Sequence, residues 1–226
     1  MLESQSVIEY LSQRGQILLF VALAGAAVFA AVQINSDTSE DPFFQTSNGI
    51  IKCPGVTPGN TFQLDGKTYT AANNTNDQEL ISNDKRICTT HVTNMSSVFG
   101  YPYVDKSYGN ISNMPTWDTS HVTTMENMFH DIYIDQNIGS WDTSNVEDMS
   151  YMFYNAGSFN QDIGSWDTSQ VTNMDLIFTG AISFNQDIST WCVEEISSKP
   201  PSFDREAGFR GQTSLQPDWG TNTGCS

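Results

Sequence analysis

Hydrophobic residues follow two patterns along this chain of 226 residues, and the first is a continuous run near the N-terminus. Residues 17–32 (ILLFVALAGAAVFAAV) contain no charged side chain. With its neighbours, this run predicts one long hydrophobic helix over residues 1–34. A bilayer-spanning helix usually requires about 20 apolar residues, so three interpretations stay open. The segment is the h-region of a signal peptide, a tilted membrane anchor, or a helix buried among copies of itself.

The second pattern is a repeat in which tryptophans recur at intervals of 24, 25 and 25 residues. The words that follow three of them align: WDTSHVTTMENMF, WDTSNVEDMSYMF and WDTSQVTNMDLIF. The period falls within the roughly 20 to 29 residues of leucine-rich-type solenoids. Stacked laps would bury the recurring apolar side chains as columns. The predicted repeat core includes Trp117, Trp141, Trp166, Trp191, Met149, Phe153, Met174 and Phe178.

The spacing inside one copy predicts its local structure. Apolar residues from Val146 to Phe153 recur at i, i+3, i+6 and i+7, which fits a strand tip running into a helical turn better than a plain strand. We expect a short strand near residues 143–148 and helix near residues 150–156. The predicted fold class is therefore an α/β repeat solenoid, leucine-rich-repeat-like, with a long N-terminal hydrophobic α-helix.

Polar positions recur in phase as well. Asn160 and Asn185 predict an inward asparagine ladder, whereas Asp142 and Asp167, each followed by Thr-Ser, are typical of local side-chain to backbone turns. The chain has no DxDxDG-like loop, so calcium binding by these turns is a weak alternative. We expect no metal site.

The ends of the array need covers, because a repeat stack cannot end on exposed apolar columns. Residues 61–70 predict a hairpin with Asp65-Gly66 at its turn. Four cysteines allow three pairings. Pairing Cys53 with Cys88 and Cys192 with Cys225 would close one cap each, which requires an oxidising compartment. Free thiols or a metal site are the alternative.

These patterns divide the chain into five parts. They are a hydrophobic helix (1–34), a polar stalk (35–49), an N-terminal cap with a hairpin (50–90), a repeat array (91–191) and a C-terminal cap (192–226).

Composition narrows the functional classes. The chain has 26 acidic against 9 basic residues and a formal charge of -17, which opposes binding to nucleic acid. Residues 107–198 hold no Lys or Arg at all. Such an acidic surface is usually a soluble face; the functional alternative is recruitment of divalent cations or basic partners. Sequons that allow glycosylation in a suitable host lie at Asn73, Asn94 and Asn110.

Motifs for catalysis are missing from the sequence. It contains no GxSxG, Walker, HExxH or GxGxxG motif. Two of its three histidines, His91 and His121, occupy the same phase of the repeat, which favours a structural role. We expect neither enzymatic activity nor a cofactor.

The repeat word, with FNQDIGSW and FNQDISTW before its tryptophans, resembles the repeat of BspA-type leucine-rich-repeat adhesins. The resemblance covers residues 87–191. It implies a cell-surface protein concerned with attachment or display, with a surface protein or a glycan as the ligand of the repeat face, and no enzymatic activity.

The N-terminal segment, QSVIEYLSQRGQILLFVALAGAAVFAAV, resembles the first helix of type IV filament subunits of the archaeal and Tad types. If Gln5 is the first mature residue, Glu9 stands fifth and Tyr10 sixth, as in that family. The resemblance implies a pilin-like homo-oligomer, held in the membrane before assembly, in which Glu9 meets the terminal amine of a neighbouring subunit. Two departures are Ser4 in place of Gly and a leader without a basic residue.

The alternative to a filament is a monomeric surface adhesin held by a signal-anchor helix. In both cases Arg14 before the apolar run and the acidic residues after it place the remainder of the chain outside the cell. We expect a cell-surface location, with the N-terminal helix in a membrane or in a filament core.

Overall fold

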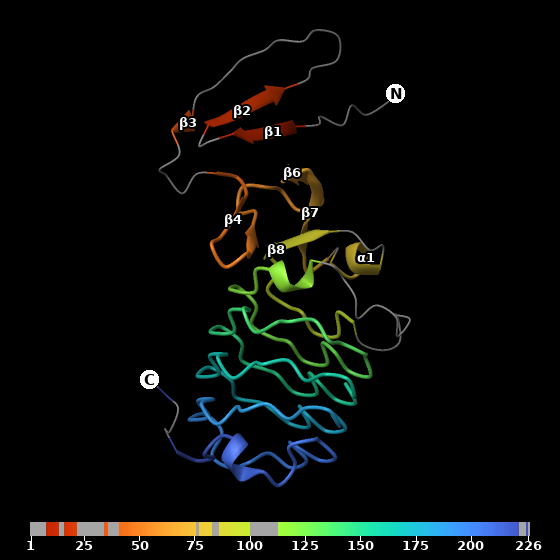
Figure 1. The fold of residues 1–226 in the computed structure, drawn as a ribbon, viewed down its shortest axis with the longest axis vertical. Coiled ribbons are helices and arrows are strands. Elements are labelled where there is room, and N and C mark those ends of the chain that lie inside the picture. The colour runs from red at the N-terminus through yellow and green to blue at the C-terminus, as the bar shows by residue number, and fades with distance from the viewer. Residues whose placement is uncertain are drawn as a thin grey trace.

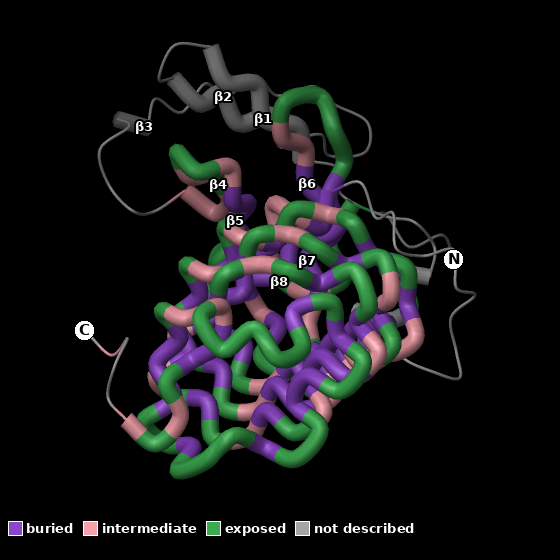
Figure 2. The backbone as a smooth tube through the Cα atoms, turned by 60° about the horizontal axis from the view of Figure 1, so that its bottom comes forward, coloured by how far each residue is buried: buried purple, intermediate pink, exposed green. Residues whose placement is uncertain are grey.

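A computed structural model describes residues 8–13, 16–21, 34–35, 41–75, 77–82, 86–99, 113–221 and 225. Three small sheets lie at the N-terminal end, and the rest of the chain winds beneath them in stacked laps (Figure 1). Figure 2 shows exposed bends on the outside of the laps and buried stretches between them. The division into five parts stays a prediction.

The N-terminal sheet overturns the predicted long helix. Its strands are β1 (Ile8–Gln13), β2 (Gln16–Val21) and β3 (Ile34–Asn35), paired antiparallel in that order. No described helix is long and apolar enough to cross a bilayer. Short apolar runs such as QILLFV suit a strand as well as a helix, and periodicity cannot separate the two.

The assembly predictions fail with this helix. Glu9 and Tyr10 lie in β1, where their register partners in β2 are Phe20 and Leu19. The pilin-like and transmembrane-helix predictions, and the filament or membrane contacts built on them, are therefore wrong for the described residues. The remainder of the apolar run, residues 22–33, lies outside the described residues.

The N-terminal cap contains the predicted hairpin. β6 (Thr61–Leu64) pairs antiparallel with β7 (Lys67–Asn73), and β8 (Ile87–His91) adds parallel to β7. Asp65 and Gly66 have φ angles of 50° and 71°, as a type I′ turn requires. The remaining elements are β4 (Phe44–Gln45), β5 (Ile51–Lys52) and helix α1 (Asp77–Ser82).

The laps consist of turns in place of the predicted strand and helix. Strand character is reduced to single parallel bridges that join Asn94 to Thr124, Thr124 to Asp148 and Asp148 to Asn173. Beyond the cap, the helical elements among the described residues are two 3-10 turns, Met114–Thr116 and Thr213–Leu215. The predicted α/β fold class is therefore wrong.

We name each lap by the tryptophan at which it begins. Backbone hydrogen bonds in the Trp141 lap show why no α-helix forms there. The amides of Met152 and Tyr154 bond to carbonyls three residues back, whereas those of Tyr151 and Phe153 bond to the next lap at Asp175 and Ile177. An α-helix would use every one of these amides within itself. Left-handed residues recur in step with this alternation: Asn127, Asp131, Tyr151, Asn155, Leu176, Gly180, Ser202 and Glu206.

The core is a set of stacked aromatic columns. The rings of Trp117, Trp141, Trp166 and Trp191 follow one another at centroid distances of 6.1, 6.5 and 6.3 Å, with interplanar angles of 6° or less. A neighbouring column holds Phe99, Phe129, Phe153 and Phe178 at 5.4 to 5.6 Å. These separations lie in the favourable range for aromatic pairs.

Two hydrogen-bond ladders fix the laps to one another. The indole N–H of Trp141, Trp166 and Trp191 donates to a carbonyl of the preceding lap at 3.0 to 3.2 Å. Buried threonine hydroxyls donate to carbonyls of the following lap at 2.8 to 2.9 Å, and these threonines are Thr89, Thr119, Thr143 and Thr168. Each ladder satisfies polar groups that would be costly to bury unpaired.

The predicted asparagine ladder exists, but on the surface. Asn160 and Asn185 are exposed, and the Asn160 Oδ1 accepts the Asn185 backbone N–H at 2.9 Å. The predicted aspartate turns also form: Asp142 Oδ1 accepts both the backbone N–H and the hydroxyl of Ser144.

The last lap closes the columns by turning its rings. Phe203 and Phe209 meet Phe178 at interplanar angles of 80° and 86°. Edge-on rings cover the end of the column without offering a new stacking surface. A disulfide joins Cys192 to Cys225 here, and another joins Cys53 to Cys88 in the N-terminal cap, which are the two local pairs considered from the sequence.

Candidate binding face

One side of the stack carries the left-handed turns, and we call it the turn face. Backbone bonds align its residues from lap to lap: the Asp131 amide donates to Tyr154, that of Asn155 to Thr179, and that of Gly180 to Arg205, at 2.8 to 2.9 Å. The turn face comprises Asn127, His130, Asp131, Tyr151, Tyr154, Asn155, Leu176, Thr179, Gly180, Ser202, Arg205 and Glu206.

The turn face varies from lap to lap more than the core, whose tryptophan and phenylalanine positions repeat. At one aligned position it carries His130, Tyr154, Thr179 and Arg205 in successive laps. By contrast, Asp-Thr-Ser follows the tryptophan in three laps without change. A constant scaffold that holds different side chains at matched surface positions is the usual architecture of a repeat-protein binding surface.

Three aromatic rings form a patch on this face, which we call the tyrosine patch: His130, Tyr151 and Tyr154. The His130 ring lies 4.7 Å from Tyr154 and 6.2 Å from Tyr151, centroid to centroid. The two tyrosine rings are 5.7 Å apart and tilted by 43°. All three residues are partly exposed. They therefore present aromatic surface to a partner.

A polar network holds His130 in place. Its Nδ1 lies 2.9 Å from Asn127 Oδ1, and its Nε2 lies 3.4 Å from Asp131 Oδ2. Asn155 donates from Nδ2 to the other oxygen of Asp131 at 2.9 Å. The network links two laps, so the patch is attached to a fixed frame.

Large exposed hydrophobic side chains flank the patch. Tyr133 and Ile182 are both 67% exposed, and they occupy equivalent positions two laps apart. Gly157 occupies that position in the lap between them, where Ile182 lies over it. The Ile182 side chain therefore lies within van der Waals distance of the place where a Cβ on Gly157 would be.

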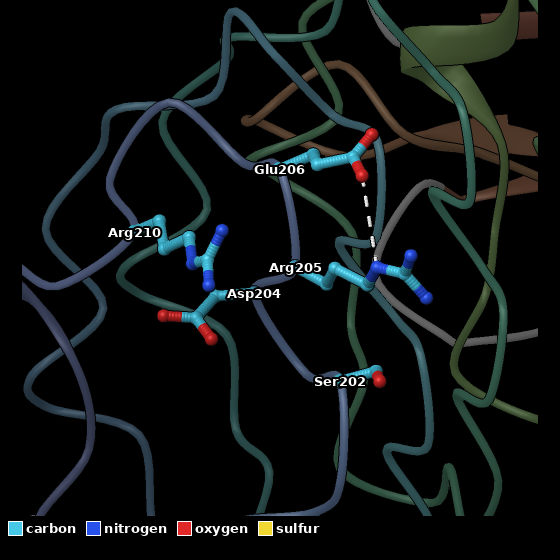
Figure 3. Close-up of a pocket in the computed structure, with 5 residues that line it drawn as sticks. All are labelled: Ser202, Asp204, Arg205, Glu206 and Arg210. Carbon is cyan, nitrogen blue, oxygen red and sulfur yellow. Dashed lines mark ion pairs between the residues drawn. The ribbon is translucent and has the colours of Figure 1, made fainter.

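A hollow of about 500 Å³ lies at the C-terminal end of the turn face (Figure 3). It is lined by Ser202, Asp204, Arg205, Glu206 and Arg210. Arg205 is directed toward Glu206, with Nε 3.6 Å from Oε1. The hollow is the point at which basic side chains first join the turn face.

Asp204 is already neutralised at this hollow. Its carboxylate lies 2.8 Å from Lys199 Nζ and accepts from Gln216 at 2.9 Å. Burial by itself would raise the pKa of Asp204, but the bonds from Lys199 and Gln216 outweigh it and lower the pKa. Arg205 is paired with Glu206, so Arg210 is the cation of the hollow that forms no ion pair among the described residues.

The other predicted site residues lie away from the turn face. Asn73 ends β7, where its Oδ1 accepts from both the amide and the hydroxyl of Thr75, and Asn94 is exposed at a bridge. Asn110 lies outside the described residues. The repeat-core tryptophans, methionines and phenylalanines are buried in the stack.

The described residues offer a single potential metal cluster, formed by Cys192, Glu194 and Cys225. Its two sulfur atoms are bonded to each other. They cannot act as thiolate ligands while that disulfide is intact.

The turn-face residues were not singled out from the sequence. The predictions from the sequence rest on residues that recur in every copy of the repeat, whereas the turn-face positions carry different residues in each lap. Aligned copies could have shown them, because Tyr151 and Tyr154 stand between invariant core residues at points where neighbouring copies carry other side chains.

Comparison with known proteins supports the repeat assignment. One family model matches residues 67–130 and 93–216, which is more than half of the chain. No curated protein and no solved structure matches it. The family is that of the BspA-like surface repeats, so this resemblance is confirmed, whereas the pilin resemblance finds no support. Family and disulfides are compatible with an extracellular location. The chain belongs to the family described as "Mycoplasma protein of unknown function, DUF285".

Proposed function

We propose that this protein is a non-enzymatic surface protein that uses its turn face to bind a macromolecular partner. The observation that carries the proposal is the contrast within each lap. The buried columns and both hydrogen-bond ladders repeat, whereas one position of the turn face changes from His130 to Tyr154 and, two laps further on, to Arg205. Different side chains at aligned positions of a fixed scaffold favour recognition.

The chemistry of the face favours binding over catalysis. Its aromatic, amide and charged groups are spread over four laps and do not converge on one point where a substrate atom would react. His130 is engaged by Asn127 and Asp131, so its ring is held as part of the surface. A spread of this kind suits contact with a large partner.

Both ends of the stack are closed in a way that suits exposure outside a cell. Cys53–Cys88 joins β8 to the segment after β5, and Cys192–Cys225 ties the tail to the last lap. Disulfides persist in oxidising surroundings. The stack would therefore keep its shape where a partner is met.

The test compares the full chain with a triple variant, Tyr151→Ser, Tyr154→Ser and Leu176→Ser. Binding of the labelled proteins to intact cells and to immobilised extracellular-matrix proteins is measured by fluorescence. The native chain is expected to bind, and the triple variant is expected to lose most of that binding.

A matched control changes exposed residues in another column, Gln170→Ser with Glu195→Gln, and should bind like the native chain. Circular dichroism and thermal unfolding verify that all three proteins are folded. Equal binding by the triple variant, or no binding by the native chain to any surface, would refute the proposal.

A further inference from the structure

Carboxylates without a neighbouring Lys or Arg lie beside the aromatic rings of the tyrosine patch. Glu126 and Asp175 are exposed on either side of the tyrosine patch along the stack, and Asp131 contacts its histidine. The Tyr151 amide donates to the carbonyl of Asp175, which places these two residues side by side. Since residues 107–198 contain no Lys or Arg, no basic group of that segment compensates these charges.

This combination matches the chemistry of one kind of partner. A Lys or Arg side chain gains from a carboxylate and from the face of a tyrosine ring together. The negative potential of the stack also attracts basic segments and repels polyanions such as acidic glycans or nucleic acid. A neutral glycan would use the rings but would leave the carboxylates without a partner.

We propose that the tyrosine patch and its flanking carboxylates bind a Lys- or Arg-bearing segment of a partner protein. This inference rests on the proposed function and adds to it the chemistry of the partner. The partner's cations lie against Tyr151 and Tyr154 and pair with Glu126 and Asp175.

The spacing of the laps sets the spacing of the partner's charges. Neighbouring backbones joined by parallel bridges are about 4.8 Å apart, so carboxylates two laps apart are separated by about 10 Å. A segment in the polyproline II conformation advances about 9 Å in three residues and completes one turn, so residues i and i+3 lie on the same side. A segment crossing the laps with a basic residue at every third position therefore fits best.

The closing lap sets the limit of this surface. Arg205 occupies the position that Tyr154 has two laps earlier, and Arg210 lines the adjoining hollow. Arg210, with Arg205 beside Glu206, disfavours a basic segment, which should therefore stop before the last lap. Substitution of these arginines also provides a control, because it should strengthen peptide binding instead of weakening it.

The experiment measures binding of a labelled peptide with Lys at every third position to the full chain by fluorescence anisotropy. The reference peptide has Gln in place of each Lys. The native chain should bind the Lys peptide and not the Gln peptide. Tyr154→Ala should weaken binding about fivefold, whereas Tyr154→Phe, which keeps a ring face, should retain it.

The charge variants distinguish binding at the tyrosine patch from general attraction by the negative charge of the stack. Glu126→Gln with Asp175→Asn should weaken binding and reduce its dependence on salt, whereas Glu195→Gln in another column should change it by less than about twofold. Arg205→Gln with Arg210→Gln should strengthen binding. Thermal unfolding of each variant verifies its fold.

Two results would overturn the inference. One is equal binding of the Lys and Gln peptides. The other is equal weakening by the Glu126–Asp175 variant and by Glu195→Gln, with no effect of Tyr154→Ala. If the native chain binds cells through the turn face but ignores the Lys peptide, the cationic partner is refuted and the proposed function stands. If the native chain binds neither cells nor the Lys peptide, both this inference and the proposed function are refuted.

Discussion

Asp118 shows how a repeated residue acquires a second role. It occupies the position of Asp142 and Asp167, which are exposed, yet its own side chain is 2% exposed. Its carboxylate accepts from Ser120 and Thr90 at 2.7 and 2.8 Å. It also lies 3.2 Å from the Lys52 Nζ. The first lap therefore uses its aspartate to hold the N-terminal cap.

The pH dependence of this contact can be predicted with its sign. Burial by itself would raise the pKa of Asp118, but the bonds from Ser120 and Thr90 and the charge of Lys52 outweigh it and lower the pKa. A carboxyl with a lowered folded pKa stabilises the fold above its unfolded pKa of about 3.9 and loses that contribution as the pH falls through the folded value.

Asp118→Asn should therefore cost about 1 to 2 kcal/mol of unfolding free energy at neutral pH, and the cost should shrink progressively below about pH 4. Urea unfolding at several pH values measures it. Asp167→Asn, at an exposed position, is the control and should cost less at every pH. A cost for Asp118→Asn that stays constant down to pH 2 would argue against an ionised contact.

The threonine ladder makes a prediction for a single hydroxyl. Thr143 is 1% exposed, and its Oγ1 donates to the Asp167 carbonyl at 2.8 Å. Thr143→Val keeps the shape but leaves that carbonyl without this donor, so we expect a loss of about 1 to 2 kcal/mol. Ser183→Ala at an exposed position should change the unfolding free energy by less than about 0.5 kcal/mol.

At the scale of the element, the lap shows why its helix was predicted and does not form. Apolar residues at i, i+3, i+6 and i+7 mark one side of a helix, but they also fit a chain of turns with left-handed residues at Tyr151 and Asn155. Sequence spacing does not separate the two. Hydrogen bonds to the next lap decide between the helix and the chain of turns. The turns of one lap leave backbone amides unpaired, and carbonyl groups of the next lap accept hydrogen bonds from them.

Two laps require glycine at the same loop position because the next lap lies close to it. A Cβ on Gly164 would lie 2.5 Å from the Asp187 carbonyl oxygen, and one on Gly139 equally close to that of Asp162. The equivalent residue of the following lap is Ser189, so a side chain is accepted there.

Gly164→Ser should therefore cost about 1 to 3 kcal/mol, because a backbone carbonyl has to move. Ser189→Gly is the matched exchange and should cost well under 1 kcal/mol. Thermal unfolding compares the two. Equal costs would mean that flexibility of the loop, rather than contact between laps, governs this position.

For the whole molecule, prediction succeeded where the pattern itself carries the structure. Trp117 to Trp191 recur at a fixed period, and their rings lie one above another. It failed for residues 8–13 and 16–21, where an apolar run is compatible with helix or strand and pairing between two adjacent segments decides. It missed the tyrosine patch, because contacts such as that of His130 with Tyr154 appear only when neighbouring laps are superposed.

The two disulfides close loops of similar length, with sequence separations of 35 and 33 residues, so chain entropy assigns each about 4 kcal/mol. Their places in the stack differ. Cys53 and Cys88 are fully buried in the core of the N-terminal cap, whereas Cys192 lies in the last lap, which has a neighbour on one side only. Stability in a stack is a sum of contacts between neighbouring laps. Loss of an end contact should therefore open the end before the centre.

Cys192→Ser with Cys225→Ser should raise amide hydrogen exchange chiefly in residues 200–219, while the Trp141 lap keeps its protection. Cys53→Ser with Cys88→Ser should lower the protection of the cap and of the Trp117 lap. Exchange followed by mass spectrometry resolves these segments. A uniform increase over all laps in both variants would mean that the stack unfolds as one unit. In that case, removal of the C-terminal disulfide should also weaken peptide binding at the tyrosine patch. If the laps open from the C-terminal end instead, binding at the patch should be retained.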